Sequence, residues 1–339
     1  MKKLFSIVLV LAMVLACSAA MAEEPISLVY AEVNPIPATL EENAEKGSVV
    51  SDVAWAFKTK LEELSGGTIV VDLQGGGAKF ADEKTALSSI MGGDNTVDIV
   101  RISAFALNQY GAQKSVFLTL PYVFESEEHY WNFVKSDLAK EFLAEAKEKG
   151  MPWTGLAYGE EGYRHFFANT DIKTIEDLKG LKIRVSDDKI MTGLVAGLGA
   201  AFTPVSFGEL YSSLQTGVVD CAEQPITNYL SNSFQEVAPY MLRDGHTLGT
   251  IELIATDSCF AKLTEEQQAM VQEAADYAMA ECEKSVMSRQ EDAYNKLIGM
   301  GVTINEVEDK TPWQEATKAV LEENIAGMED IYDQIVALK

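Results

Sequence analysis

The alternation of apolar strand patterns with helical patterns constrains this fold more than any other feature of the sequence. Residues 26–33 form an apolar run that predicts a strand, and residues 49–64 carry apolar side chains at helical spacing. A β-branched, alternating run at 68–73 predicts a second strand; a helix at 83–91 and a strand at 97–102 follow. Such alternation needs crossover connections, so we predict an α/β fold with a largely parallel sheet.

The alternation resumes with shorter elements in the second half of the chain. About 317 residues remain once the first 22 are set aside, which is more than one hydrophobic core usually serves. We therefore expect two lobes. Strands are predicted at 153–158, 164–168, 181–185 and 218–222, and helices at 189–198 and 207–215. Lobe I is expected to comprise 23–158, with 250–290 returning to it, and lobe II 159–249, with 291–339 packing across the lobes.

The longest helical pattern runs from Thr264 to Met300. Thr264 is a good N-cap, and acidic residues follow it in the first turn. At 1.5 Å per residue such a helix is roughly 50 Å long, so it can span both lobes. A last helix is predicted at 313–338, with Gly327 inside it.

The first 22 residues have the pattern of an export signal. Two lysines precede a short apolar segment at 4–16, and Ala20-Met21-Ala22 fits a cleavage site. Cys17 loosely resembles the cysteine of a lipoprotein box, but Leu15 fits that motif poorly. We therefore favour soluble export to the periplasm over lipid anchoring through Cys17.

The net charge of −25 restricts the possible partners. So acidic a chain is not expected to bind nucleic acid or an anionic membrane through its bulk charge. If the ligand is an anion, its attraction must come from a few arginines that point into a cleft.

No catalytic or metal-binding pattern stands out. The three histidines lack metal-site spacing, there is no G-x-S-x-G motif, and Gly75-Gly76-Gly77 lacks the signature of a nucleotide loop. Cys221, Cys259 and Cys282 have no metal-site spacing and allow either one disulfide or three free thiols. We expect no cofactor, no metal and no enzymatic activity.

Arg164 and Arg184 each lie in or beside a short predicted strand. A buried guanidinium needs an anionic partner, and its planar fork matches a carboxylate through two parallel hydrogen bonds. Asp177, Asp187 or Asp188 could supply that carboxylate to Arg184, or a ligand could. The residues alone support the two alternatives equally.

Two more residues occupy positions where ligands bind in α/β folds. Phe207 opens a predicted helix after Ser206 and could cover a ligand, although packing in the core is the default for an aromatic side chain. Gln224 follows the strand at 218–222, at the carboxyl edge of the sheet.

Together these motifs resemble the solute-binding proteins of TRAP (tripartite ATP-independent periplasmic) transporters, of the dicarboxylate-binding type. The resemblance rests on G-x-R at 162–164, I-K-T-x-E-D-L-K-G-L-K-I-R-V at 172–185, P-x-x-F-x-E-L-Y at 204–211 and L-Q-T-G-V-V-D at 214–220. Weaker similarity covers nearly the whole mature chain. It implies two α/β lobes that close on a ligand like a Venus flytrap, with a long helix crossing both.

The resemblance also implies roles for individual residues. By position, Arg184 resembles the arginine that grips the ligand carboxylate, and Arg164 a second basic residue that supports it. Phe207 resembles the aromatic residue that closes over the ligand, and Asn34 a contact from the first lobe. Gln224 stands where the family usually has Asn, so its longer side chain either changes the amide contact to the ligand or leaves less room for a ligand.

The family resemblance does not lead us to expect an arginine at position 101. Arg101 lies in the strand predicted at 97–102, and Ser103 follows that strand directly. Being two residues apart, they lie on the same face, and both could point at the cleft. The ligand would then carry a second anionic group, such as a carboxylate or a phosphate. The alternative is a salt bridge within lobe I.

We therefore expect a monomeric protein that captures a small organic anion and delivers it to TRAP membrane permease subunits. A C4-dicarboxylate is the family default, but a sugar acid, a phosphorylated polyol or an aromatic acid would also satisfy Arg184. One alternative is a receptor that presents its ligand to a sensor protein. A more remote one is an exported hydrolase or lyase, which would need a nucleophile–base or carboxylate pair in the cleft.

Overall fold

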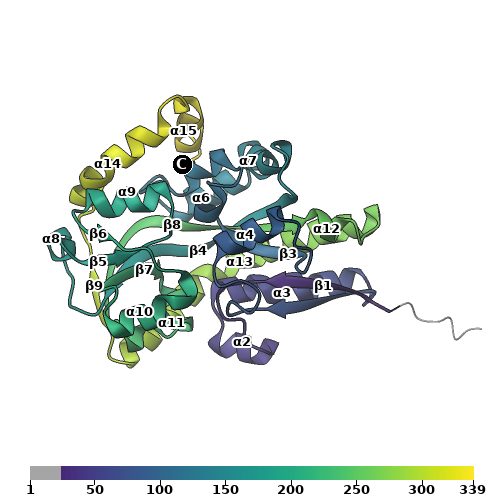
Figure 1. Cartoon of the computed structure of the whole chain (residues 1–339), viewed down its shortest axis with the longest axis horizontal. Coiled ribbons are helices and arrows are strands. Elements are labelled where there is room, and N and C mark those ends of the chain that lie inside the picture. The colour runs from purple at the N-terminus through teal and green to yellow at the C-terminus, as the bar shows by residue number, and fades with distance from the viewer. Residues whose placement is uncertain (1–23) are drawn as a thin grey trace, which may run out of the picture.

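The computed structural model describes residues 24–339, so the predicted signal peptide, with Cys17, lies outside the described residues. Within 24–339 one sheet of nine strands has the order β2-β1-β3-β8-β4-β7-β5-β6, and β9 pairs with β8 (Figure 1). The strands are β1 (Ile26–Ala31), β2 (Ile69–Gln74), β3 (Ile99–Ser103), β4 (Trp153–Ala168), β5 (Lys182–Arg184), β6 (Ala201–Phe202), β7 (Cys221–Pro225), β8 (Tyr240–Thr256) and β9 (Thr303–Glu306).

Two long antiparallel strands, β4 and β8, join the two lobes of the molecule. Figure 1 shows them crossing its middle, with β1 and β3 on one side (lobe I) and β5, β6 and β7 on the other (lobe II). Strand β2 pairs with β1 and so belongs to lobe I. The sequence predicted separate strands at 153–158 and 164–168, whereas the structure has one strand with register shifts. The expected lobe boundary at 158/159 falls inside this strand. Bulges let one strand bend and continue into the second lobe.

The prediction of a largely parallel sheet is correct for the pairs among β1, β2 and β3 and among β5, β6 and β7, and wrong for the pairs that the connecting strands β4 and β8 make with β3, β7 and each other. The pairs β1–β2, β1–β3, β5–β6 and β5–β7 are parallel, whereas β3–β8, β4–β8 and β4–β7 are antiparallel. The reason is topological. A chain that crosses from lobe I to lobe II and later returns must traverse the middle in opposite directions.

The predicted long helix is confirmed as α13 (Glu265–Gly299), which begins with a capping box between Thr264 and Gln267. It packs against β4 and α11, and against α3 (Val49–Leu64). The other helices are α2 (Leu40–Lys46), α4 (Glu83–Met91), α5 (Ala104–Leu107), α6 (Glu127–Val134), α7 (Asp137–Glu148), α8 (Ile175–Leu178), α9 (Lys189–Gly197), α10 (Leu210–Thr216), α11 (Ile226–Ser231), α12 (Asp257–Phe260), α14 (Thr311–Ile325) and α15 (Glu329–Val336), with 3-10 turns η1 (Gln113–Leu118), η2 (Phe207–Glu209) and η3 (Phe234–Glu236).

The single helix predicted at 313–338 is wrong. Gly327 adopts φ 81°, in the left-handed region that ends a helix, and separates α14 from α15. The break lets the two helices cover different parts of the molecule. α14 packs against α9 in lobe II, whereas the carbonyl of Ile335 in α15 lies 2.8 Å from Nε2 of His129 in α6.

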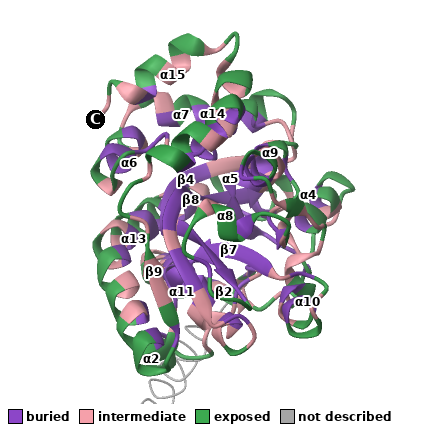
Figure 2. Ribbon diagram, turned by 90° about the vertical axis from the view of Figure 1, so that its left-hand side faces the viewer, coloured by how far each residue is buried: buried purple, intermediate pink, exposed green. Residues whose placement is uncertain are grey.

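The hydrophobic core is divided. One cluster fills lobe I around residues such as Phe57 and Phe133, and another fills lobe II around Ile183 and Leu194. Figure 2 shows the buried strands β4, β7 and β8 inside a shell of helices with exposed outer faces. No helix in the described part of the chain is long and apolar enough to cross a membrane.

The sequence allows either one disulfide or three free thiols, and the structure has three free thiols. Cys221, Cys259 and Cys282 are all free and buried. Burial raises the pKa of the Cys259 thiol to about 12, with a further contribution from nearby Asp98. The thiols of residues 24–339 therefore act as small core side chains rather than as crosslinks or nucleophiles.

Candidate functional site

A cleft of about 310 Å³ lies between the lobes. Residues predicted as ligand contacts from both lobes meet there, although they belong to elements that are distant in the sequence. All seven predicted ligand contacts line it: Asn34, Arg101, Ser103, Arg164, Arg184, Phe207 and Gln224. Their common location is a structural fact, and their role in binding stays a prediction.

Arg184 ends strand β5, which lies beside β7, so its side chain emerges at the carboxyl edge of lobe II. The side chain is buried; its Nε donates a hydrogen bond to the carbonyl of Val205 at 3.1 Å, and its guanidinium lies 5.8 Å from the centre of the Phe207 ring. Among residues 24–339, no aspartate or glutamate forms a salt bridge with it, including the three aspartates considered from the sequence. Burial lowers the pKa of Arg184, and the more distant charge of Glu223 does not reverse that effect.

Arg164 has the opposite environment. From β4 it reaches Glu223 on β7, where Nε bonds one carboxylate oxygen and Nη2 bonds the other at 3.0 Å. Its Nη1 donates to Glu161 at 2.8 Å. Burial by itself lowers the pKa of Arg164, but the two glutamates outweigh burial and raise it. Gly162 adopts φ 89° at a register shift of β4, which explains the glycine of the G-x-R motif.

Glu223 also pairs with a buried histidine. His246 lies 3.6 Å from Glu223, and its Nδ1 lies 2.7 Å from Asp244. Burial lowers the pKa of His246, but Asp244 and Glu223 together raise it to about 9. Burial would raise the pKa of Glu223, yet Arg164 and His246 hold it at about 2. Lobe II therefore contains a compensated network of buried charges.

Arg101 matches the alternative of a salt bridge within lobe I. Its Nε and Nη2 bond the two carboxylate oxygens of Glu32 at 2.6 and 2.8 Å, and Nη1 bonds Glu83 at 2.7 Å. Ser103 donates hydrogen bonds to the same Glu83 through its amide and its hydroxyl. Burial lowers the pKa of Arg101, but Glu32 and Glu83 outweigh it and raise it well above its usual range.

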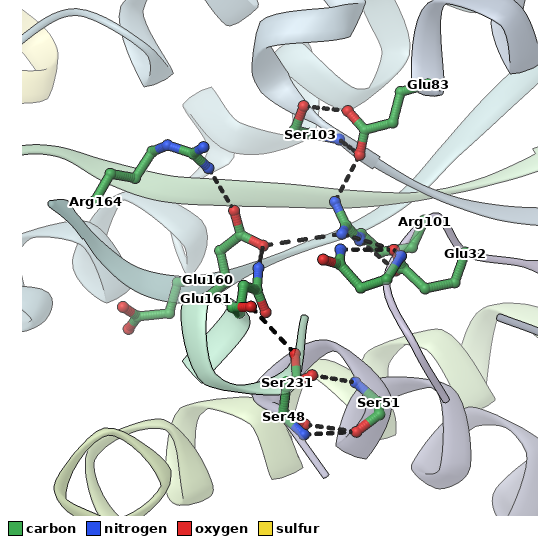
Figure 3. A network of polar contacts seen from close by, with 12 residues as sticks. Glu32, Ser48, Ser51, Glu83, Arg101, Ser103, Glu160, Glu161, Arg164 and Ser231 are labelled. Carbon is green, nitrogen blue, oxygen red and sulfur yellow. Dashed lines mark hydrogen bonds and ion pairs between the residues drawn. The ribbon is translucent and has the colours of Figure 1, made fainter. Parts of the chain in front are cut away.

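Glu161 connects the two networks, as Figure 3 shows. It accepts from Arg164 at 2.8 Å and from Asn228 at 2.8 Å, and its carboxylate lies 3.9 Å from Arg101. Glu161 and the carboxylates Glu32, Glu83 and Glu223 were not predicted from the sequence. A signal existed for Glu161 and Glu223, because buried strands rarely hold carboxylates without a partner.

The sequence offers Asp188 as a partner for Arg184, whereas in the structure its side chain caps a helix. It is the N-cap of α9, where Oδ1 accepts hydrogen bonds from the amides of Ile190 at 2.9 Å and Met191 at 3.1 Å. Its other oxygen, Oδ2, is buried and accepts no hydrogen bond from any described residue. Burial raises the pKa of Asp188 to about 7. The side chain lines the cleft.

The three remaining predicted contacts have different surroundings. Phe207 opens η2 and packs edge-to-face on Phe234, with the ring centres 6.1 Å apart. Gln224 lies on β7 and is buried. Asn34 accepts a hydrogen bond from Asn232 across the lobes at 3.0 Å.

The lobes also touch across the cleft. Lys84 of lobe I forms a 3.1 Å salt bridge with Asp187 of lobe II, and Gln109 donates to the carbonyl of the same aspartate at 2.6 Å. The amide of Gly208 donates to the carbonyl of Ala81 at 3.2 Å. These contacts close the cleft around its lining residues.

Two α/β lobes joined by a pair of strands, with a cleft lined by buried arginines between them, form the architecture of a two-lobe solute-binding protein. The model of one such family, the bacterial extracellular solute-binding proteins of family 7, matches residues 40–327. The chain therefore belongs to this family, and the resemblance stated from the motifs is confirmed.

Similar proteins agree with this assignment. A solute-binding protein from Chromohalobacter salexigens is 30% identical over 65% of this chain, and the chain spans 62% of that relative's length. The sialic acid-binding periplasmic protein SiaP of Vibrio cholerae is 27% identical, over 83% of this chain and 85% of its own. A TRAP periplasmic solute-binding protein from Bradyrhizobium sp., solved with galacturonate, superposes with a TM-score of 0.82 at 28% identity, covering 92% of this chain and 99% of its own.

Proposed function

We propose that this protein captures a small organic acid between its lobes and delivers it to TRAP permease subunits in the membrane. Arg184 carries the proposal. It is a buried arginine that lines the cleft, and no carboxylate in the described part of the chain forms a salt bridge with it. A buried cation without a counter-ion is unfavourable, and a ligand carboxylate supplies the missing charge.

The other cleft residues support the same conclusion. Phe207 lies beside the guanidinium, and an apolar ring next to this charge lowers the local polarity and strengthens a charge-assisted hydrogen bond. The similar proteins bind acids of this kind: sialic acid in the name of SiaP, and galacturonate in the Bradyrhizobium structure. We therefore extend carboxylate binding to this chain.

Binding alone explains the site, so we propose no reaction. The two glutamates that line the cleft, Glu83 and Glu161, are engaged with Arg101 and Arg164, and the three buried thiols do not line the cleft. We further propose that the mature protein is a periplasmic monomer whose closed form docks on the permease. Ligand favours the closed form only as far as it binds that form better than the open one.

Isothermal titration calorimetry with a panel of organic acids tests this function. The panel comprises C4-dicarboxylates, aldonates, uronates, an aromatic acid and a phosphorylated polyol. We expect at least one carboxylic acid to bind, and Arg184→Ala to weaken its binding about 100-fold, as expected for truncating one partner of a buried charge pair. Native mass spectrometry of the purified protein identifies any acid that remains bound.

Arg243→Ala provides the matched control. Arg243 is an arginine of lobe II outside the cleft, paired with Glu306, so its removal should leave affinity unchanged. Undiminished binding by the Arg184→Ala protein would contradict the proposed function. Conversion of any panel acid to a product would contradict the absence of a reaction.

A further inference from the structure

The charges of the cleft limit how many anionic groups a ligand can bring. Four cations line it, namely Lys84, Arg101, Arg164 and Arg184. Three already have carboxylate partners: Asp187 for the lysine, Glu32 and Glu83 for Arg101, and Glu223 and Glu161 for Arg164. Within residues 24–339, only Arg184 is left to meet an anion from outside.

The cleft also contains an acceptor without a donor. Asp188 is only 4% exposed, and its Oδ2 accepts no hydrogen bond from the described chain. A buried acceptor left unsatisfied is unfavourable, so this oxygen is stabilised either by a proton, as the raised pKa of Asp188 indicates, or by a hydrogen-bond donor. Backbone amides at the start of α9 occupy the other oxygen and hold the carboxylate in position.

Asp188 and Arg184 select for different groups. Arg184 is next to Val205 and Phe207, whereas the charges that act on Asp188 are those of Glu223 and Arg164. A ligand carboxylate near Asp188 would place two like charges together, and they could not both ionise freely. A ligand hydroxyl would instead donate the missing hydrogen bond.

We propose that Asp188 is a specificity-determining residue that accepts a hydrogen bond from a ligand hydroxyl, so that the cleft takes hydroxylated monocarboxylates rather than dicarboxylates. The ligand carboxylate binds Arg184 and its hydroxylated part meets Asp188. The inference rests on the proposed function. The ligand then carries no second anionic group for Arg101, whose charge is already matched by glutamates of lobe I.

Three pairs of acids test the selection by calorimetry: galactonate and galactarate, gluconate and glucarate, erythronate and meso-tartrate. Within each pair the acids differ only in whether the far end is a CH₂OH group or a carboxylate. We expect the monocarboxylate of at least one pair to bind, and to bind about tenfold or more tightly than its partner. A tenfold ratio corresponds to about 1.4 kcal/mol.

Asp188→Asn tests the residue itself. Asparagine is nearly the same size and is also a good N-cap, so α9 should keep its start. Its amide can donate to a carboxylate, so we expect the monocarboxylate to lose about tenfold in affinity and the dicarboxylate to gain. Asp177→Asn is the control, because Asp177 is an exposed aspartate of lobe II outside the cleft and its removal should leave the ratio unchanged.

The possible outcomes distinguish failure of the inference from failure of the proposed function. Preference for the dicarboxylate in any pair, or an unchanged ratio in Asp188→Asn, overturns the inference and leaves the proposed function standing. Binding of succinate or an aromatic acid with none of the six acids binding does the same. If no acid of either panel binds and none co-purifies, the proposed function fails, and the inference fails with it.

Discussion

Arg164 and Arg184 are both buried arginines of lobe II that line one cleft, yet their surroundings are opposite. Arg164 is held by Glu223 and Glu161, and their charges raise its pKa despite burial. Arg184 has a carbonyl and an aromatic ring beside it, and burial lowers its pKa. An arginine in a cleft therefore does not by itself mark a ligand site. What matters is whether the fold already supplies its counter-ion.

The same contrast applies to buried carboxyl groups. Glu223 faces Arg164 and His246, which hold its pKa at about 2. Glu252 lies on β8 opposite Tyr158, and burial without a cation raises its pKa to about 8. Paired groups are part of the scaffold, whereas unpaired groups respond to what is added, either a ligand or a proton.

The largest expected effect comes from removing Arg164, the arginine whose charge is matched by buried glutamates. Arg164→Met leaves Glu223 and Glu161 buried without the guanidinium that bonds both of them, so we expect the free energy of unfolding to fall by about 3–5 kcal/mol. Urea denaturation followed by circular dichroism measures this loss. In the double variant Arg164→Met with Glu223→Gln, part of the stability should return because the strongest unpaired charge is gone. An Arg164→Met protein as stable as the wild type would remove the distinction between the two arginines.

Arg184→Met should do the reverse. No buried carboxylate loses a partner, so the ligand-free variant should unfold within about 1 kcal/mol of the wild type. At a ligand concentration of 100 Kd the wild type should gain about 2.7 kcal/mol of stability, and the variant almost none. Thermal unfolding with and without the acid that binds best in calorimetry measures both quantities. A ligand-free variant as unstable as Arg164→Met would mean that Arg184 is also part of the scaffold.

Unpaired carboxyl groups should make the protein less stable as the pH rises. The pKa of Glu252 is about 8 in the folded protein, above its usual value, so the folded state holds a proton that the unfolded state releases. Its contribution to stability is complete below about pH 4.5 and is lost as the pH rises towards 8. Glu252→Gln should therefore raise the free energy of unfolding at pH 8 by at least about 2 kcal/mol, and at pH 5 by no more than about 1 kcal/mol.

Unfolding curves recorded at pH 5, 6.5 and 8 measure this slope. His246 acts in the same direction at higher pH, since its raised pKa of about 9 makes its contribution disappear as the pH passes 9. Glu306→Gln serves as control, because Glu306 is an exposed carboxylate paired with Arg243. A Glu252→Gln protein whose stability still falls between pH 5 and 8 as steeply as the wild type would contradict this account.

The smallest effect should come from the exposed salt bridge across the cleft. Lys84 and Asp187 are both more than half exposed, so their contact contributes about 0–1 kcal/mol. Lys84→Met should weaken ligand binding no more than about fivefold, because it removes one contact of the closed form. Calorimetry at low and high salt measures it, and the difference between the proteins should shrink as salt screens the charges. A larger loss would place Lys84 on the ligand itself.

Much of the fold follows from local patterns in the sequence. The capped helix α13, the strands of lobe I and the arrest of helices at glycines could be predicted because they depend on neighbouring residues. The break at Gly327 could have been predicted from that glycine. The continuity of β4 could not, because its bulges depend on pairing with β8, about ninety residues later.

The candidate site divides in the same way. By itself, the sequence placed seven side chains at the cleft, because motifs and strand positions mark strand ends and helix starts, but it did not mark Glu83 and Glu161 there. Only the tertiary structure decided which arginine is engaged. Arg101 meets Glu32 across 69 residues of sequence, and Arg164 meets Glu223 across 59. Whether a buried charge has a counter-ion depends on distances in space, and a charge pattern along the chain does not contain those distances.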